Sequence, residues 1–154
     1  QKLNSEQYGN GVGLLKMASA IQFTLPGVPS IYYGDEQGMC GVCDPFNRLP
    51  FKEDCEELHE YYVNLSKLRN SADALSVGQA VFMAASSEVL MVLRYVNQNA
   101  DAFGHPAENG AFLTVLNRSA EDAPYEADCI PADCGIIRGT IKGETAEIIP
   151  IRNS

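Results

Sequence analysis

Tryptophan is absent from this chain, and basic residues are scarce: 11 lysines and arginines stand against 20 aspartates and glutamates. The formal net charge of −9 argues against nucleic acids and anionic membranes as partners, because both require clustered positive charge. No apolar stretch approaches the length that a bilayer-spanning helix requires. We therefore predict a globular protein that has neither of these partners and whose acidity serves chiefly its solubility.

Cysteine is present five times, an odd number, so the thiols cannot all pair with one another within the chain. Free thiols are normal in a reducing compartment. The N-terminus also lacks the basic and apolar regions of a signal peptide. These observations predict a cytoplasmic location, with export as the alternative.

The first 36 residues predict a helix followed by a strand. Apolar side chains between residues 12 and 25 surround the helix on more than one side, which indicates burial around much of its circumference. Pro26 and Gly27 end it, because proline lacks a backbone donor and glycine accepts a left-handed conformation. Residues 28–33 are apolar and rich in strand-forming types, which predicts a strand buried on both faces.

A long loop and a second helix follow. The loop covers residues 37–52, and loops of that length in compact domains are often functional. Asp54 and Glu57 fit the first and last positions of a capping box, so the helix is predicted to begin at residue 54. Apolar residues at three- and four-residue spacing continue to residue 68, followed by Arg69 in the last turn.

The periodicity changes near residue 78, where we place a domain boundary between residues 1–78 and 79–154. Short segments with strand-forming composition follow, separated by turns. They cover residues 81–83, 89–96, 111–116, 125–128, 136–141 and 146–151. Several short strands with frequent turns predict an antiparallel β-sandwich.

One sequence segment resembles a known family. Pro26-Gly-Val-Pro-Ser-Ile-Tyr-Tyr-Gly-Asp-Glu-Gln-Gly-Met39 is similar to the eighth barrel strand of the α-amylase family of glycoside hydrolases. Asp44-Pro45-x-x-Arg48 resembles the neopullulanase, cyclomaltodextrinase and maltogenic amylase branch. The resemblance continues through residues 65–69 and 114–119, so it covers most of the chain.

The resemblance implies an α+β fragment: the last strand and flanking helices of a (β/α)₈ barrel, followed by the antiparallel C-terminal β-sandwich. In this family the nucleophile, the acid/base and the third carboxylate follow barrel strands four, five and seven. All three would lie before residue 1. We therefore expect the C-terminal part of an enzyme that acts on α-glucans or maltooligosaccharides, without a cofactor and inactive by itself.

Candidate substrate-binding residues follow from the same resemblance. In the resembling branch, an aspartate and an arginine at the positions of Asp44 and Arg48 hydrogen-bond a glucose unit; the alternative is a salt bridge that fixes the loop. Tyr33 is a candidate for lining the sugar site, with packing as the alternative. Glu36 could face the pocket mouth, although a structural role is the stronger expectation. Asp35 and Glu36 cannot be a glycosidase pair, because such carboxyl groups face one another across the sugar, roughly 5–9 Å apart.

The cysteines near the loop allow a metal hypothesis. Cys40-x-x-Cys43 is followed by Cys55 and His59, four apart on the predicted helix, which resembles a structural zinc pattern. The alternatives are a redox disulfide between Cys40 and Cys43 or incidental thiols. We favour incidental thiols, because the sugar-site motif fills this interval and the family needs no metal there.

The predicted strand at residues 28–33 raises a physical problem, because the chain offers it no obvious parallel neighbours. An unpaired apolar strand promotes aggregation or swapping. We therefore expect residues 12–36 either to pack on the sandwich or to mediate self-association. Two other functions remain open: a non-catalytic carbohydrate-binding module, which the absence of tryptophan disfavours, and a zinc-stabilised interaction module.

Overall fold

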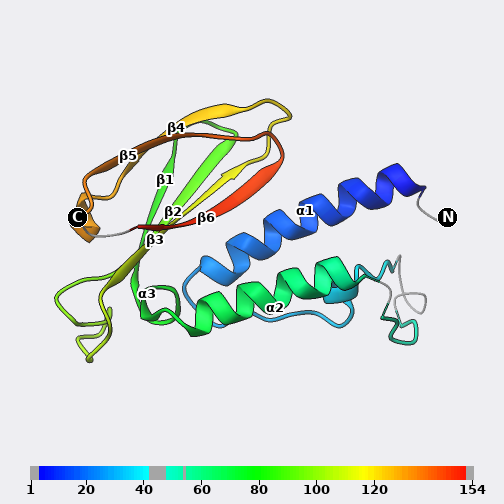
Figure 1. Cartoon of the computed structure of the whole chain (residues 1–154), viewed down its shortest axis with the longest axis horizontal. Helices are drawn as coiled ribbons and strands as arrows, with labels where there is room; N and C mark the ends of the chain where they lie inside the picture. Colours follow the sequence, from blue (N-terminus) through cyan, green and yellow to red (C-terminus); the bar gives the residue numbers. More distant parts are fainter. Residues whose placement is uncertain (1–3, 42–47, 54, 152–154) are drawn as a thin grey trace.

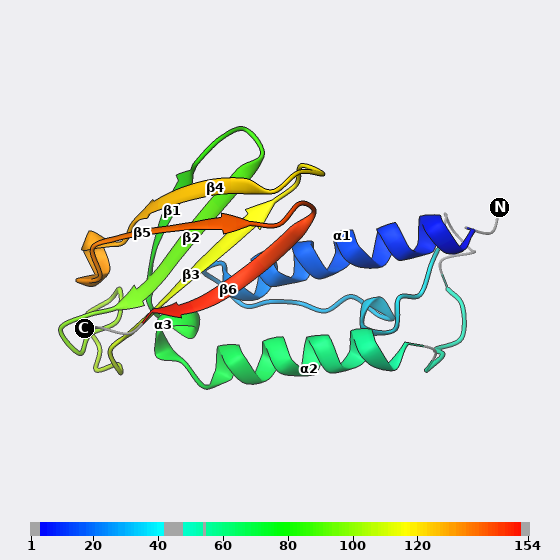
Figure 2. The same cartoon turned by 45° about the horizontal axis from the view of Figure 1, so that its top comes forward.

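The structure is a computed structural model that describes residues 4–41, 48–53 and 55–151. Figures 1 and 2 show three layers: a pair of long helices, a four-stranded sheet and a two-stranded sheet. The helices are α1 (Ser5–Thr24), α2 (Glu56–Asn70) and α3 (Asp73–Ser76), with short 3₁₀ turns η1 (Asp35–Gln37) and η2 (Ile130–Ala132). The strands are β1 (Gln79–Ala84), β2 (Val89–Val96), β3 (Gly110–Asn117), β4 (Ala123–Asp128), β5 (Ile136–Ile141) and β6 (Thr145–Ile151).

Helix α1 begins earlier than its apolar pattern predicts. Asn4 caps it, because its side chain accepts from the Gln7 backbone while the Gln7 side chain accepts from the Asn4 backbone. This reciprocal capping box satisfies two backbone donors that a helix start leaves open. The polar residues from Ser5 onward are therefore helical. The predicted burial around much of the helix is not found in this chain, because Met17, Ala20 and Phe23 are buried while Leu14 is exposed.

Helix α2 packs beside α1. Phe23 of α1 joins Leu58, Tyr62 and Leu65 of α2 in one buried cluster, which confirms the three- and four-residue spacing as the inward face of α2. The helix begins at Glu56, with Cys55 as its N-cap and no side-chain capping bond. Asp54, the predicted capping residue, lies outside the described residues.

The predicted strand at residues 28–33 does not form. These residues have no regular secondary structure, and the side chains of Val28 and Tyr32 are 94% and 69% exposed. Figure 2 shows this segment running back along the two helices, outside both sheets. A parallel strand takes its backbone hydrogen bonds from neighbouring strands, and every sheet strand in the described residues lies between residues 79 and 151. Strand-forming composition alone therefore does not produce a strand here.

The predicted antiparallel sandwich is confirmed, and all six strand segments form close to the expected residues. The large sheet has the order β1-β2-β3-β6 and the small one pairs β4 with β5, all antiparallel. Leu93, Leu113 and Val115 of the large sheet are fully buried in a cluster with Ala127 and Ile141 of the small sheet. Burial at alternate residues from both sheets is the arrangement that defines a sandwich core.

Two buried arginines bind backbone carbonyl groups near the end of α1, one from the large sheet and one from α2. Arg94 of β2 donates to the carbonyl oxygens of Thr24 at 2.7 Å and Gly78 at 2.9 Å. Arg69 of α2 donates to those of Phe23 at 2.6 Å and Leu25 at 3.1 Å, and also to that of Gly27. The C-terminal end of a helix leaves carbonyl groups unpaired and carries partial negative charge, so it suits cations. Burial lowers the pKa of Arg94 to about 10, and Arg69 nearby adds to this, but both guanidinium groups stay charged at neutral pH.

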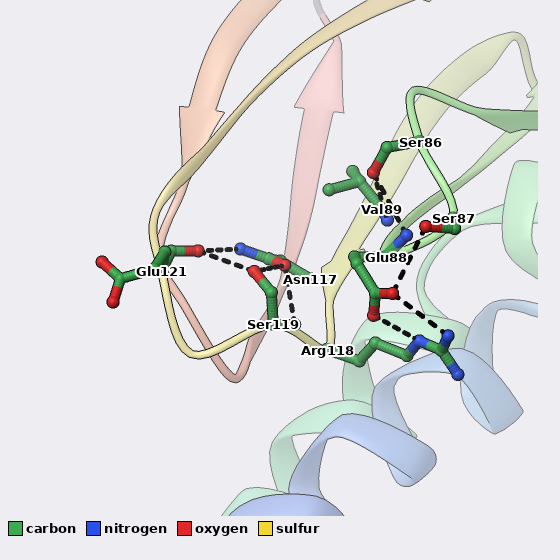
Figure 3. Close-up of polar contacts among 8 residues, drawn as sticks. All are labelled: Ser86, Ser87, Glu88, Val89, Asn117, Arg118, Ser119 and Glu121. Carbon is green, nitrogen blue, oxygen red and sulfur yellow. Dashed lines mark hydrogen bonds and ion pairs between the residues drawn. The ribbon is translucent and has the colours of Figure 1, made fainter.

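A buried asparagine organises the corner between the two sheets (Figure 3). The Asn117 side chain donates to the carbonyl oxygen of Glu121 at 2.8 Å and accepts from the backbone and hydroxyl of Ser119 at 3.0 and 2.8 Å. Beside it, Nε and Nη2 of Arg118 each donate a hydrogen bond to one carboxylate oxygen of Glu88. The 114–119 segment thus has a structural role, since it fixes the chain where it leaves β3 for β4.

Candidate functional site

The structure describes only part of the predicted sugar-binding pair. Asp44 lies outside the described residues. Arg48 is exposed and stands in a stretch without regular secondary structure. A contact between the two side chains, whether as a salt bridge or as joint sugar ligands, therefore stays a prediction.

Tyr33 is held at the surface by the returning loop. Its hydroxyl lies 3.4 Å from the carbonyl oxygen of Leu49, and its ring centre is 5.6 Å from that of Phe51, with the ring planes tilted by 57°. The Tyr33 side chain remains 53% exposed. This geometry fixes the phenol ring while leaving part of it open to solvent, which suits a ring that contacts a ligand.

A glycine-bounded turn carries the two acidic candidates. Gly34 and Gly38 flank η1 with φ of 86° and 61°, left-handed values that favour glycine. A Cβ on Gly38 would meet the Tyr8 hydroxyl at 2.5 Å, so the Tyr8 side chain would have to shift to admit a larger residue. Gln37 between them is buried and accepts from the Cys55 backbone at 3.1 Å, which ties the turn to the start of α2.

Glu36 has an unusual carboxylate. Its Oε2 is buried and has no hydrogen-bond partner among the described residues. Burial raises the pKa of Tyr62, and the carboxylates of Asp35 and Glu36 raise it further, so these acids lie close to the α2 surface. The pKa of Asp35 is also raised, first by burial and then by the charge of Glu36. A buried carboxylate oxygen normally has a donor, so the Glu36 environment indicates a place for one.

A groove of about 750 Å³ lies beside Glu36, between residues 31–36 and helix α2. Its walls are mostly apolar and aromatic, contributed by Ile31, Tyr32, Tyr33, Tyr62 and Val63, with polar groups that include Lys67. The structure thus brings Tyr33 and Glu36 together at one groove. Arg48 is not among its lining residues.

The zinc hypothesis gains no support from the described residues. Cys40 and His59 are exposed and Cys55 is half-buried. In the part of the chain that the structure describes, no three His, Cys, Asp or Glu side chains gather as a metal site would require. Cys43, the remaining candidate, lies outside the described residues. No helix among the described residues has the length and apolarity that crossing a membrane requires.

Sequence reasoning did not assign a site role to Gln37 and Phe51, and it placed Arg69 only as a cation in the last turn of its helix. Phe51 is an apolar residue in a polar loop, which is a weak signal for a ring contact. Gln37 and Arg69 carry no local signal, because their partners are backbone groups 18 and 42–46 residues away along the chain.

Comparison with known proteins supplies the relatives of this chain. No family model matches it. It is 33% identical over 116 residues to an amylopullulanase of Thermoanaerobacterium saccharolyticum, a match that covers 74% of this chain and 9% of the relative. It is 39% identical over 117 residues to neopullulanase 2 of Thermoactinomyces vulgaris, a match that covers 73% of this chain and 18% of the relative. A cyclomaltodextrinase of Geobacillus thermopakistaniensis is 35% identical over 119 residues, a match that covers 75% of this chain and 19% of the relative.

The chain is homologous to part of the α-amylase-family glycoside hydrolases. It matches less than a fifth of the length of these relatives. Among solved structures, the Anoxybacillus α-amylase superposes with a TM-score of 0.76 at 21% identity, over 93% of this chain and 33% of that one. The maltogenic amylase of S. marinus superposes with a TM-score of 0.68 at 26% identity, over 90% of this chain and 19% of that one. Two helices with an antiparallel sandwich therefore recur as one region of larger α-amylase-family enzymes.

Proposed function

We propose that this chain is the C-terminal portion of an α-glucan-acting glycoside hydrolase of the α-amylase or neopullulanase type. In this proposal residues 1–78 complete a (β/α)₈ catalytic barrel and residues 79–154 form the C-terminal β-domain. The observation that carries it is the apolar segment at residues 28–33, which is exposed in this chain although its composition suits a strand buried on both faces. The names of the homologues, among them amylopullulanase and cyclomaltodextrinase, supply the substrate class.

In the parent enzyme, residues 28–33 and the groove beside Glu36 would be covered by the rest of the protein. Ile31 and Tyr32 would then lie against neighbouring barrel strands, which would pair with the backbone of this segment. The unpartnered Oε2 of Glu36 would receive a donor from the same direction. One barrel would thus satisfy both the apolar and the polar features that this chain leaves open.

Hydrogen exchange tests this arrangement. In this chain the backbone amides of residues 28–33 should exchange rapidly, because they lie outside both sheets. In the full-length parent the same amides should be strongly protected, while those of β2 and β3 should be protected in both proteins. Rapid exchange of residues 28–33 in the parent would contradict the barrel assignment.

The catalytic part of the proposal concerns Asp44 and Arg48. We place them as ligands of a glucose unit, since a carboxylate accepts from sugar hydroxyls and a guanidinium donates in a planar fork. The chain alone should not hydrolyse maltooligosaccharides, because the adjacent Asp35 and Glu36 cannot flank a glycosidic bond. The parent should hydrolyse them.

An activity assay with variants tests these roles. In the parent, Asp44→Ala and Arg48→Ala should each lower kcat/KM at least tenfold, whereas Glu147→Ala, an exposed acid on β6, should leave it unchanged. Turnover by the isolated chain, or unaltered kinetics of both variants, would reject the assignment.

When the chain is separate from its parent, we propose that the exposed segment drives self-association through residues 12–36. Replacing Val28 and Ile31 by serine should shift light-scattering masses from oligomer towards monomer, because both side chains are exposed and apolar. A monomeric wild-type chain at high concentration would exclude this.

A cytoplasmic location is also part of the proposal. Cys40, Cys55 and Cys129 are free thiols, which suits a reducing compartment. Mass spectrometry of protein from the native cells, alkylated at harvest, should find these three thiols labelled; a disulfide among them would contradict the proposed location.

A further inference from the structure

The loop between β2 and β3 presents an aromatic pair to solvent. Phe103 is 85% exposed, and its ring centre lies 6.4 Å from that of His105, with the planes tilted by 39°. Figures 1 and 2 show this loop projecting at the α3 end of the molecule, away from the η1 turn that carries Glu36. The site described above makes no use of this pair.

A nearly buried carboxylate sets the positions of both rings. Asp101 Oδ1 accepts from the backbone N–H groups of Phe103 and His105, each at 2.8 Å, and Oδ2 lies 3.2 Å from His105 Nδ1. The side chain of Asp101 is only 8% exposed, whereas that of His105 is 76% exposed. The negative charge is therefore turned inward, and the ring surfaces are turned outward.

The contact between His105 Nδ1 and Asp101 leaves the other ring nitrogen, Nε2, available to a ligand. In the neutral tautomer that donates from Nδ1 to this carboxylate, Nε2 keeps its lone pair. On a largely exposed ring that nitrogen can accept a hydrogen bond from a hydroxyl group. The pair thus combines an apolar ring face with one oriented acceptor.

Hydrogen bonds from its backbone hold this loop in place. The Glu108 backbone donates to the Asp73 carboxylate at 2.7 Å, and the Asn99 backbone donates to the Asn109 side chain at 2.7 Å. The Ala102 backbone reaches the Val77 carbonyl oxygen at 3.4 Å. A surface that is already ordered loses little conformational entropy when it binds.

The charge of the chain narrows the ligand class. A net charge of −9 disfavours phosphate-bearing or other anionic ligands at a surface whose anchor is itself a carboxylate. A pyranose suits the pair, because it has an apolar C–H face for Phe103 and hydroxyl donors for His105 Nε2. Resting on the proposed function, we propose that Phe103 and His105 form a second, non-catalytic contact site for α-glucan chains.

Affinity electrophoresis of the 154-residue chain in gels with soluble starch tests this site, with maltoheptaose titration followed by NMR for affinity. Starch should retard the wild-type chain. Phe103→Ala should weaken maltoheptaose binding at least tenfold, and His105→Phe, which keeps a ring but removes the acceptor, should weaken it less. Phe82→Ala is the matched control, because Phe82 is also an exposed phenylalanine, at 58%, on β1. It should bind like the wild type, and cellohexaose should not bind.

The outcomes separate this site from the proposed function. Absence of starch retardation, equal binding by the Phe103→Ala variant, or equal loss in the Phe82→Ala control would each overturn the site. If the parent still hydrolyses α-glucans in that case, the proposed function stands without it. If the chain binds through Phe103 while the parent hydrolyses no α-glucan, the proposed function fails and the site remains.

Discussion

The sandwich half, residues 79–151, and the helical half, which the structure describes between residues 4 and 78, cover their apolar side chains to different degrees. Leu93, Leu113 and Val115 of the sandwich are fully buried between its two sheets. In the helical half Val28 is 94% exposed and Leu14 of α1 is 61% exposed. The sandwich has both of its layers within this chain, whereas the helices and residues 28–33 have one covered side. The difference is the one we expect if, as proposed above, the helical half packs against the rest of a larger enzyme.

Buried polar groups do not show the same contrast between the two halves. Asn117 in the sandwich has partners on both its amide nitrogen and its oxygen. Glu36 in the helical half has a buried carboxylate oxygen without a partner among the described residues. The hydroxyl of Thr114 on β3 is also buried without a partner among the described residues. Since buried polar atoms are normally paired, each half has one exception, and only the apolar contacts distinguish the two halves.

The largest expected effect contrasts two leucines. Leu113→Ala in the sandwich core should lower the free energy of unfolding by about 3 kcal/mol, because it removes a fully buried side chain and leaves a cavity. Leu14→Ala on the exposed side of α1 should change it by less than about 0.5 kcal/mol. Urea unfolding of both variants measures this. Comparable losses would remove the contrast between the two halves.

The contact between α2 and the end of α1, inside the helical half, should show an intermediate effect. Arg69→Ala removes donors from three carbonyl oxygens near the end of α1, so we expect a loss of about 2 kcal/mol. Lys67→Ala, in the same turn of α2 but exposed, is the matched control and should cost far less. Hydrogen exchange should also increase more in α1 than in β3. An equal increase of exchange in both elements would mean that Arg69 does not act specifically at the end of α1.

The smallest effect concerns the ion pair shown in Figure 3. Arg118 lowers the pKa of Glu88, so the folded state favours the ionised carboxylate. The resulting stabilisation is present at neutral pH and is lost as pH falls through the lowered pKa. The difference in Tm between the wild type and Glu88→Gln should therefore be small at pH 7 and vanish in acid.

The control for this pair is the same substitution in an Arg118→Gln background. There Glu88→Gln should have no pH-dependent effect on Tm, since the charged partner is gone. Thermal melts at low salt measure both series, because salt screens exposed ion pairs. An unchanged pH dependence in the double variant would assign it to another group.

Local sequence pattern predicted the sandwich well because each strand is matched by an antiparallel partner within this chain. Residues 89–96 and 111–116 were predicted as strands, and β2 and β3 pair with each other directly. Residues 28–33 have an equally strong composition, yet a parallel strand needs neighbours from distant parts of a chain. The same kind of pattern thus succeeded or failed according to where its partners lie.

For the candidate site, sequence resemblance selected Tyr33 and Glu36, and the structure places both at one groove beside α2. The resemblance could not indicate that Gln37 connects this turn to the start of α2 or that Phe51 packs on Tyr33. Those contacts join residues that are 18 positions apart along the chain, and no local period connects them.

By itself the sequence determined the class of the fold, the positions of the strands and the kinship to α-glucan-acting enzymes, because alternation, turns and motifs are local properties. The tertiary structure alone decided that residues 28–33 stay outside a sheet and that Arg69 and Arg94 meet at the end of α1. Both outcomes depend on which backbone groups lack partners after the chain has folded, and that is a property of the whole arrangement.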